Sequence, residues 1–292
     1  MTPILSSLAD LDGRYDALFC DLWGCLHDGI RPFPAAVEAL KRFRAGGGVV
    51  VLLTNSPKPR AGVEVQLAGM GIGPDLYDTI ASSGDAALDA LASGDFGQKV
   101  WHLGGPKDAS FFEALDRDYP GHGIERVALE EAEGMVITGL ADDTTETPED
   151  YRLEIAQGVN AGLKMLCANP DIVVDRGDKR LWCAGSLAQA YTAAGGDARY
   201  FGKPYTPIYD LALKRLEAET GRVPDRDRVL CVGDGIITDV RGAVAEGLDS
   251  LFITGGLARE ETETVTDPVP EKLEAFIAEN KLTPTYALGW LR

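Results

Sequence analysis

The stretch ALFCDLWGCLHDG, residues 17–29, decides the predicted fold. Its first four residues are apolar and run directly into Asp21, and a glycine-punctuated turn with a second acid at Asp28 follows. A short apolar run bounded by turn residues is typical of a buried strand in a parallel sheet. Asp21 is therefore expected at the carboxyl end of a strand, which is where ligands bind in open α/β sheets.

The composition indicates a folded protein with an acidic surface. The 292 residues exceed the usual span of one hydrophobic core, so we predict two structural units. With 45% hydrophobic and 25% charged residues, the chain has the balance of a globular protein. The net charge of -18 argues against nucleic acid or an anionic membrane as the main partner. A small anionic substrate would then need a local cation.

The segment MTPILSSLADLDG at residues 1–13 contains no basic region followed by an apolar one, and no apolar run approaches the ~20 residues of a membrane span. We therefore predict a cytoplasmic protein. Five cysteines form no C-x-x-C pair and leave an odd one over, so buried reduced thiols are expected rather than disulfides or a zinc site. They are Cys20, Cys25, Cys167, Cys183 and Cys231.

Apolar runs rich in β-branched residues alternate with helix-like segments. Strands are predicted at 49–55, 198–204, 228–234 and 248–256, with helices at 34–48, 206–221 and 238–247. This alternation predicts an α/β fold, a Rossmann-like doubly wound parallel sheet with helices on both faces.

The middle of the chain has strand and helix signals of its own. We predict that residues 83–196 form a second α/β unit inserted into a core made of residues 1–82 and 197–292. The acid-rich stretch ADDTTETPED, residues 141–150, is expected to be a solvated connection or a helix start.

Polar residues follow several predicted strands of the core, and parallel strands bring their carboxyl ends to one edge of the sheet. These residues are Asp21, Thr54, Asn55, Lys203, Asp234 and Asp239. Lys58, Arg60 and Arg241 lie near the same motifs and are expected to be solvated surface charges.

Four motifs in order carry a family resemblance: CDLWGCLHDG, LLTNSPKPR, FGKPYTP and CVGDGIITDVRGA. Together they resemble the haloacid dehalogenase (HAD) superfamily of aspartate-nucleophile phosphotransferases, subclass IIA. That group includes nucleotide, sugar and pyridoxal phosphate phosphatases with a large α/β cap inserted after the second motif. The resemblance covers nearly the whole chain, because ANPDIVVDRG and CAGSLAQAY also look like this subclass.

The resemblance implies a phosphatase or phosphotransferase that acts on a small phosphorylated metabolite. It makes Asp21 the nucleophile that forms an aspartyl phosphate, with Lys203 neutralising the phosphoryl group. It also implies Mg²⁺ held by Asp21, Asp234 and the backbone carbonyl of Trp23, with Asp239 binding a metal-bound water.

Four further residues are expected near the substrate by the same resemblance. Thr54 and Asn55 would contact the phosphate, and Asn169 and Asp171 of the inserted cap would contribute to specificity. A turn-forming role is an equal alternative for the Asn-Pro-Asp triplet at 169–171. Oligomerisation through the cap is common in this subclass, so a homodimer is compatible with the resemblance.

Trp23 departs from the family pattern. Most phosphatases of the superfamily have a second Asp two residues after the nucleophile as general acid and base, and an indole does not titrate near neutral pH. Several outcomes stay open: a leaving group that needs no proton, another donor such as His27, a long-lived aspartyl phosphate, or a protein that only binds a phosphorylated ligand or partner. For His27 the alternative is a loop histidine with local hydrogen bonds.

Two other enzyme classes fail on spacing. A dinucleotide-binding G-x-G-x-x-G motif would need a third glycine after Gly233 and Gly235, where Thr238 stands. A P-loop would need Ser or Thr after Lys203, and Pro204 follows instead.

Overall fold

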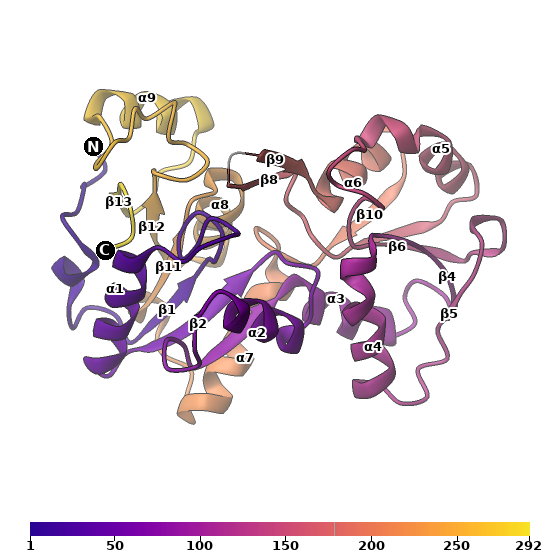
Figure 1. Cartoon of the computed structure of the whole chain (residues 1–292), viewed down its shortest axis with the longest axis horizontal. Helices are drawn as coiled ribbons and strands as arrows, with labels where there is room; N and C mark the ends of the chain where they lie inside the picture. The colour runs from indigo at the N-terminus through magenta and orange to yellow at the C-terminus, as the bar shows by residue number, and fades with distance from the viewer. Residues whose placement is uncertain (178) are drawn as a thin grey trace.

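The computed structural model describes residues 1–177 and 179–292, which form two parallel sheets and a small hairpin. Figure 1 shows the six-stranded sheet with its helices on the left and the five-stranded sheet on the right. We call them the core sheet and the cap sheet. Among the described residues, no helix has the length and apolarity needed to cross a membrane.

The core sheet is doubly wound around its central strand β1 (Ala17–Cys20). Its order is β13 (Tyr286–Leu288), β12 (Asp249–Ile253), β11 (Val229–Gly233), β1, β2 (Val49–Thr54) and β3 (Thr79–Ser82), and all neighbours are parallel. The chain builds outward from β1 to β2 and β3, and later returns to the other side of β1 at β11. The strand order therefore reverses at β1, and the predicted α/β fold is confirmed.

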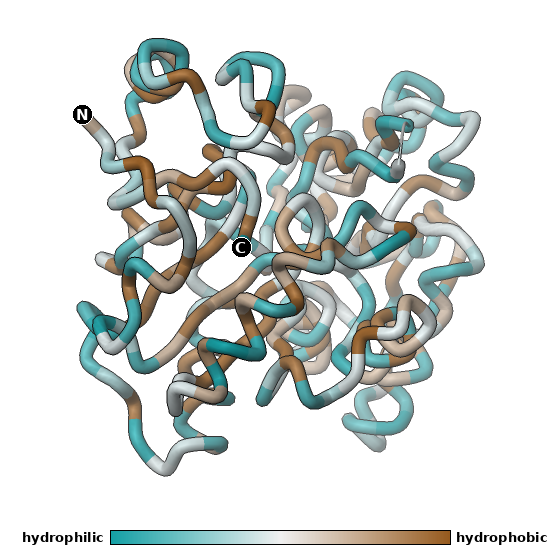
Figure 2. Tube along the Cα trace, turned by 60° about the vertical axis from the view of Figure 1, so that its left-hand side comes forward, coloured by the Kyte–Doolittle hydropathy of each residue, from teal (hydrophilic) through white to brown (hydrophobic). Residues whose placement is uncertain are grey.

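The four residues of β1 are all buried because helices cover both faces of the core sheet. Leu18 and Cys20 pack in the same cluster as residues of α1 (Pro34–Ala45) and α2 (Arg60–Gly69). Ala17 and Phe19 point to the opposite face, where α7 (Thr206–Thr220) packs. The helices α8 (Arg241–Glu246) and α9 (Pro270–Asn280) complete this half, and hydrophobic segments run through its strands in Figure 2.

The cap sheet is also parallel, in the order β10 (Asp197–Tyr200), β7 (Lys164–Cys167), β6 (Gly134–Ile137), β4 (Lys99–Leu103) and β5 (Glu125–Arg126). Its helices are α3 (Ser83–Ala92), α4 (Ala109–Asp118), α5 (Arg152–Asn160) and α6 (Ala184–Ala193). A short helix, Pro148–Tyr151, ends the acid-rich stretch and leads into α5, as expected for a helix start. The antiparallel hairpin of β8 (Val173–Arg176) and β9 (Lys179–Trp182) lies between the two halves in Figure 1.

One strand joins a different sheet from the one expected. The strand predicted at 198–204 was assigned to the core, but β10 pairs with β7 in the cap sheet. Its sequence, DARY, contains two charged residues, and its residues alternate between exposed and partly buried, as suits the edge of a sheet. Lys203 therefore reaches the core from the end of a cap strand. The division into residues 1–82 with 197–292 and 83–196 remains a prediction.

Candidate active site

Asp21 lies at the point where the strand order of the core sheet reverses. Its backbone N–H donates to the Val232 carbonyl at 2.8 Å, which extends the β1–β11 pairing by one residue. Its side chain is buried and pairs with the ammonium of Lys203, with 2.7 Å between Oδ1 and Nζ. A carboxylate thus meets a cation at the topological switch point, the place where doubly wound sheets bind ligands.

Lys203 is 2% exposed and serves two carboxylates. Its Nζ lies 2.7 Å from Asp21 and 2.6 Å from Asp239. Burial alone would lower the pKa of Lys203, but the charges of Asp21 and Asp239 outweigh it and raise that pKa well above its usual value. The ammonium therefore stays charged at neutral pH. Burial raises the pKa of Asp21, and the adjacent Lys203 charge opposes that increase.

Asp234 follows β11 and is enclosed by glycines. The Leu257 backbone N–H donates to its Oδ2 at 2.9 Å. A Cβ added to Gly24 or Gly256 would lie 2.0 or 1.9 Å from the same oxygen, so only glycine leaves room for the carboxylate at both positions. Burial, together with the negative charges of Asp21 and Asp239, raises the pKa of Asp234 well above its usual value. This crowding of negative charge is a place that a divalent cation would stabilise.

Asp239 lies in a π-helical turn, Ile236–Val240, between β11 and α8. Its Oδ1 contacts Lys203, and its Oδ2 accepts hydrogen bonds from the Gly235 N–H at 3.0 Å and the Thr238 hydroxyl at 3.3 Å. Both oxygens therefore already have protein partners. This arrangement fits a residue that acts on a metal through water better than a direct metal ligand.

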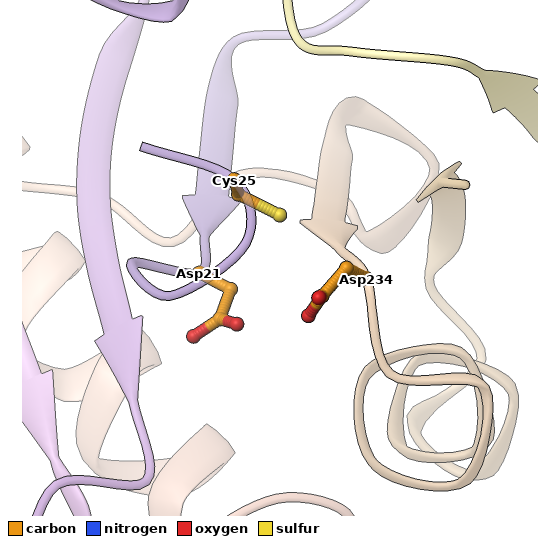
Figure 3. A group of neighbouring side chains, drawn as sticks. All are labelled: Asp21, Cys25 and Asp234. Atoms are coloured by element: carbon orange, nitrogen blue, oxygen red, sulfur yellow. The ribbon is translucent and has the colours of Figure 1, made fainter. Parts of the chain in front are cut away.

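The donor atoms closest to one another come from Asp21, Asp234 and Cys25, and lie within 4.8 Å of one another. Figure 3 shows the two carboxylates and the thiol pointing into one space between the ends of β1 and β11. Burial, followed by the nearby acids, raises the pKa of the Cys25 thiol well above its usual value, so it keeps its proton. Two carboxylates beside a protonated thiol favour a hard, oxygen-preferring ion such as Mg²⁺.

Asn55 links the site to the cap. Its Oδ1 accepts a hydrogen bond from the Lys203 N–H at 2.6 Å, and its Nδ2 donates to the Lys203 carbonyl at 3.1 Å and to Asp171 at 2.8 Å. These bonds use both amide hydrogens of Asn55, so its side chain positions Lys203 and Asp171. Its predicted contact with substrate stays a prediction.

The other predicted substrate contacts lie around the same space. Thr54 ends β2, is buried, and accepts a hydrogen bond from the Ser56 N–H at 3.2 Å. The Asn169 side chain accepts from the Asp171 N–H at 3.0 Å, which is the turn-forming role weighed for this triplet. Desolvation raises the pKa of Asp171 to about 6, and this partly buried carboxyl lines both cavities described below.

Two cavities of about 320 and 370 Å³ meet at Asp21, and both are also lined by Trp23, Asp171 and Val174. The smaller one contains Lys203, Asp234 and Asp239 and extends toward Trp290. The larger one contains Thr54 and Asn55 and extends between the core and the cap. The sequence-predicted residues therefore surround the junction of the two cavities.

Trp23 forms a wall of both cavities and packs over its own loop. A Cβ on Gly29 would lie 2.1 Å from the indole, and the ring of His27 meets it edge-on at 5.3 Å. His27 is fully buried, lines neither cavity within the described chain, and accepts a hydrogen bond from the Gly29 N–H at 3.0 Å through Nδ1. Burial lowers the pKa of His27 to about 4, so the structure favours a loop-stabilising role over proton donation.

Sequence reasoning missed two features of the site. Cys25 was grouped with the other buried thiols, and although all five are buried and free, Cys25 is the one whose thiol joins the donor atoms of Asp21 and Asp234 among the described residues. Lys58 was expected to be a solvated charge, but it is half-buried and lines the larger cavity. Its place four residues after Thr54 in LLTNSPKPR was the available signal.

The fold and this sheet edge define a class: proteins with a Rossmann-like α/β core, a carboxylate at the switch point of its sheet and a second α/β sheet beside it. Family models described as haloacid dehalogenase-like hydrolase and HAD-hydrolase-like match residues 18–117 and 200–276. A crystal structure of a haloacid dehalogenase-like hydrolase from Brucella suis 1330 is 39% identical, with a TM-score of 0.86 over 99% of this chain and 100% of that one. The chain belongs to the haloacid dehalogenase-like hydrolases, and the resemblance read from its motifs is confirmed.

Two further relatives have named activities. A D-glycerol 3-phosphate phosphatase from Mycobacterium tuberculosis is 28% identical over 88% of this chain and 67% of its own length. A crystal structure of a glycerol phosphate phosphatase from the same organism, in complex with magnesium, is 26% identical, with a TM-score of 0.66 over 98% of this chain and 77% of that one.

Proposed function

We propose that this protein is a phosphatase that hydrolyses a small phosphorylated metabolite through a covalent intermediate on Asp21. One observation carries the proposal: a buried carboxylate at the switch point of the sheet is held 2.7 Å from a buried, charged lysine, with a second buried carboxylate beside it. The named activities of the relatives from Mycobacterium tuberculosis support the same reaction class.

In the proposed reaction, an Asp21 oxygen attacks phosphorus and the bond to the leaving oxygen breaks. This gives an aspartyl phosphate, which water then hydrolyses to inorganic phosphate and free Asp21. Lys203 offsets the negative charge of the phosphoryl group during both steps, and Thr54 provides a hydroxyl at the neighbouring strand end. Asn55 holds Lys203 in place through its backbone.

The residues present fit a magnesium site. Asp21 and Asp234 supply carboxylate oxygens within 4.8 Å of each other, and the glycines around Asp234 leave space for its carboxylate. We propose that these two side chains and the Trp23 carbonyl hold the ion, with Asp239 acting through a bound water. When bound, Mg²⁺ neutralises negative charge on the transferred phosphoryl group. The magnesium-containing structure of a relative supports this choice.

Trp23 stands where most phosphatases of this family have a general acid, and we propose that its absence sets the leaving-group preference. The buried, neutral His27 is poorly placed to replace that acid. Substrates whose leaving oxygen needs no proton should therefore react faster than alkyl phosphates. A loss of general acid catalysis costs about 10²- to 10⁴-fold in rate for poor leaving groups.

The test is hydrolysis of p-nitrophenyl phosphate by the purified full chain with Mg²⁺, compared with Asp21→Asn. This substitution keeps the shape of the side chain and removes the nucleophile, so we expect a loss on the order of 10⁴- to 10⁶-fold in kcat. Asp116→Asn is the matched control, because that carboxylate is exposed on the cap and 75% accessible.

Equal phosphate release by wild type and Asp21→Asn would rule out catalysis through Asp21. If neither protein releases phosphate but wild type binds inorganic phosphate in a Mg²⁺-dependent manner, the alternative function stands: a member of the family that binds a phosphorylated ligand or partner without turnover. Trp23 is the feature that favours this alternative.

A further inference from the structure

The larger cavity carries a cluster of positive charge away from the nucleophile. Three cations line it: Lys58 from the loop after β2, Lys107 from the turn before α4, and Arg176 at the end of β8. One of these segments belongs to the core sheet side, and the other two belong to the inserted unit. The fold therefore brings three positive side chains from distant parts of the sequence to one cavity.

Lys58 is the most enclosed of the three. It is half-buried, and its Nζ donates a hydrogen bond to the Gln66 side chain at 2.8 Å. Burial lowers the pKa of Lys58, and the charges of Lys107 and Arg176 lower it further, while Asp108 opposes them. Lys107 and Arg176 thus line the same cavity as Lys58 and add positive charge to its surroundings, and an anion bound there would offset that charge.

Two acids lie among these cations. Asp143 pairs with Lys107. Asp108 is 1% exposed, and its Oδ2 accepts hydrogen bonds from the Gly105 N–H at 3.1 Å and the Thr138 hydroxyl at 3.2 Å. Its Oδ1 has no hydrogen-bond partner among the described residues. Asp108 lines the cavity, and its second oxygen is a buried polar group that the described protein residues leave without a partner.

This cation cluster is made of other residues than the charges around the nucleophile. The charges that act most strongly on Asp21 are those of Lys203, Asp239 and Asp171. Those acting on Lys58 are Asp108, Lys107 and Arg176. The cavity thus has a phosphate-binding end at Thr54 and Asp21 and a separate cationic end, in a chain whose net charge is -18.

We propose that the cationic end binds a second anionic group of the substrate, so that the preferred substrate is a small phosphomonoester with a carboxylate or a second phosphate at its far end. This inference rests on the proposed function, because it assumes that the transferred phosphate binds at Asp21.

The experiment compares matched probes as inhibitors of p-nitrophenyl phosphate hydrolysis by the full chain with Mg²⁺. The carboxylate arm sets 3-phosphoglycerate against glycerol 3-phosphate, and the phosphate arm sets fructose 1,6-bisphosphate against fructose 6-phosphate. Within each pair only one probe has the second anionic group. We expect the doubly anionic probe of at least one pair to bind about tenfold more tightly or better, as a charge-assisted contact provides. The arm with the larger ratio identifies the second group.

Lys58→Gln and Arg176→Gln should each reduce that ratio about tenfold by removing one charged contact. Lys99→Gln is the matched control, since Lys99 is an exposed cap residue that lines neither cavity, and its ratio should equal that of wild type. A ratio near one for both pairs in wild type, or a ratio unchanged in both variants, overturns the inference. Failure of the proposed function is a different result: p-nitrophenyl phosphate is then not hydrolysed at all, or is hydrolysed without Asp21.

Discussion

The site around the nucleophile and the cap end of the larger cavity treat charge in opposite ways. At the core sheet, Lys203 is 2% exposed and already bonded to two buried carboxylates, so its charge is matched inside the protein. At the cap end, the side chain of Lys107 is 52% exposed, and Arg176 is also exposed. A buried ion pair holds its side chains in one geometry, whereas solvent-exposed cations can still exchange bound water for a ligand. We propose that the reaction takes place at the first and that the substrate is selected at the second.

The largest expected effect comes from removing the matched cation. Lys203→Met leaves Asp21 and Asp239 buried side by side, so we expect a loss of about 3–5 kcal/mol in the free energy of unfolding and a fall in kcat on the order of 10³-fold. Urea denaturation and p-nitrophenyl phosphate turnover measure the two. Lys203→Arg keeps the charge and should lose less stability. If Lys203→Met is as stable as wild type, the ion pairs of Lys203 with Asp21 and Asp239 do not stabilise the fold, contrary to this prediction.

Trp23→Asp tests what the catalytic end lacks. If the missing acid limits turnover, this substitution should accelerate hydrolysis of an alkyl phosphate by about 10²-fold or more, and should affect p-nitrophenyl phosphate much less. Trp23→Asn is the control, because it removes the indole from Gly29 and His27 without adding a titrating group. An equal gain in both variants would mean that the indole merely blocks the site.

Gly256→Ala tests whether close packing around Asp234 sets metal affinity. The new methyl group would lie 1.9 Å from Asp234 Oδ2 and must displace the carboxylate. We expect the Mg²⁺ concentration for half-maximal activity to rise about 10- to 100-fold, as it does when residues that orient a ligand are changed. Gly69→Ala is the control, since nothing lies within 4 Å of the added atom there. An unchanged Mg²⁺ requirement would remove Asp234 from the metal site.

The smallest expected effect is a change in stability with pH, and it comes from His102 of the cap sheet. Burial lowers the pKa of His102 to about 4, below its usual 6.5, and its Nε2 lies 2.9 Å from the Thr138 hydroxyl. The unfolded chain therefore takes up a proton near pH 6.5, whereas the folded chain does so only near pH 4. Stability from this residue is complete above pH 6.5 and is lost as pH falls toward 4, by about 2 kcal/mol between pH 7 and pH 5. Urea denaturation at both pH values should show a smaller drop for His102→Gln, and an equal drop would contradict this assignment.

The catalytic end was easier to predict from sequence than the cap end, for a physical reason. Asp21, Thr54 and Asp234 each stand at the end of a short apolar run. Parallel pairing brings the carboxyl ends of such strands to one edge of the sheet, independently of the conformation of the loops. Lys107 and Arg176 follow no such rule, because their positions depend on how the inserted unit packs against the core. β10 was assigned to the wrong sheet for a similar reason. A strand of four residues, two of them charged, has no hydrophobic pattern that indicates which strand it pairs with.

The amide of Asn55 joins three parts of the molecule at once. One end of it holds the backbone of Lys203, and the other donates to Asp171 in the segment between β7 and β8. A single side chain therefore holds both the lysine opposite the nucleophile and an acid of the segment that leads into the hairpin. A change at Asn55 would disturb the support of both at once.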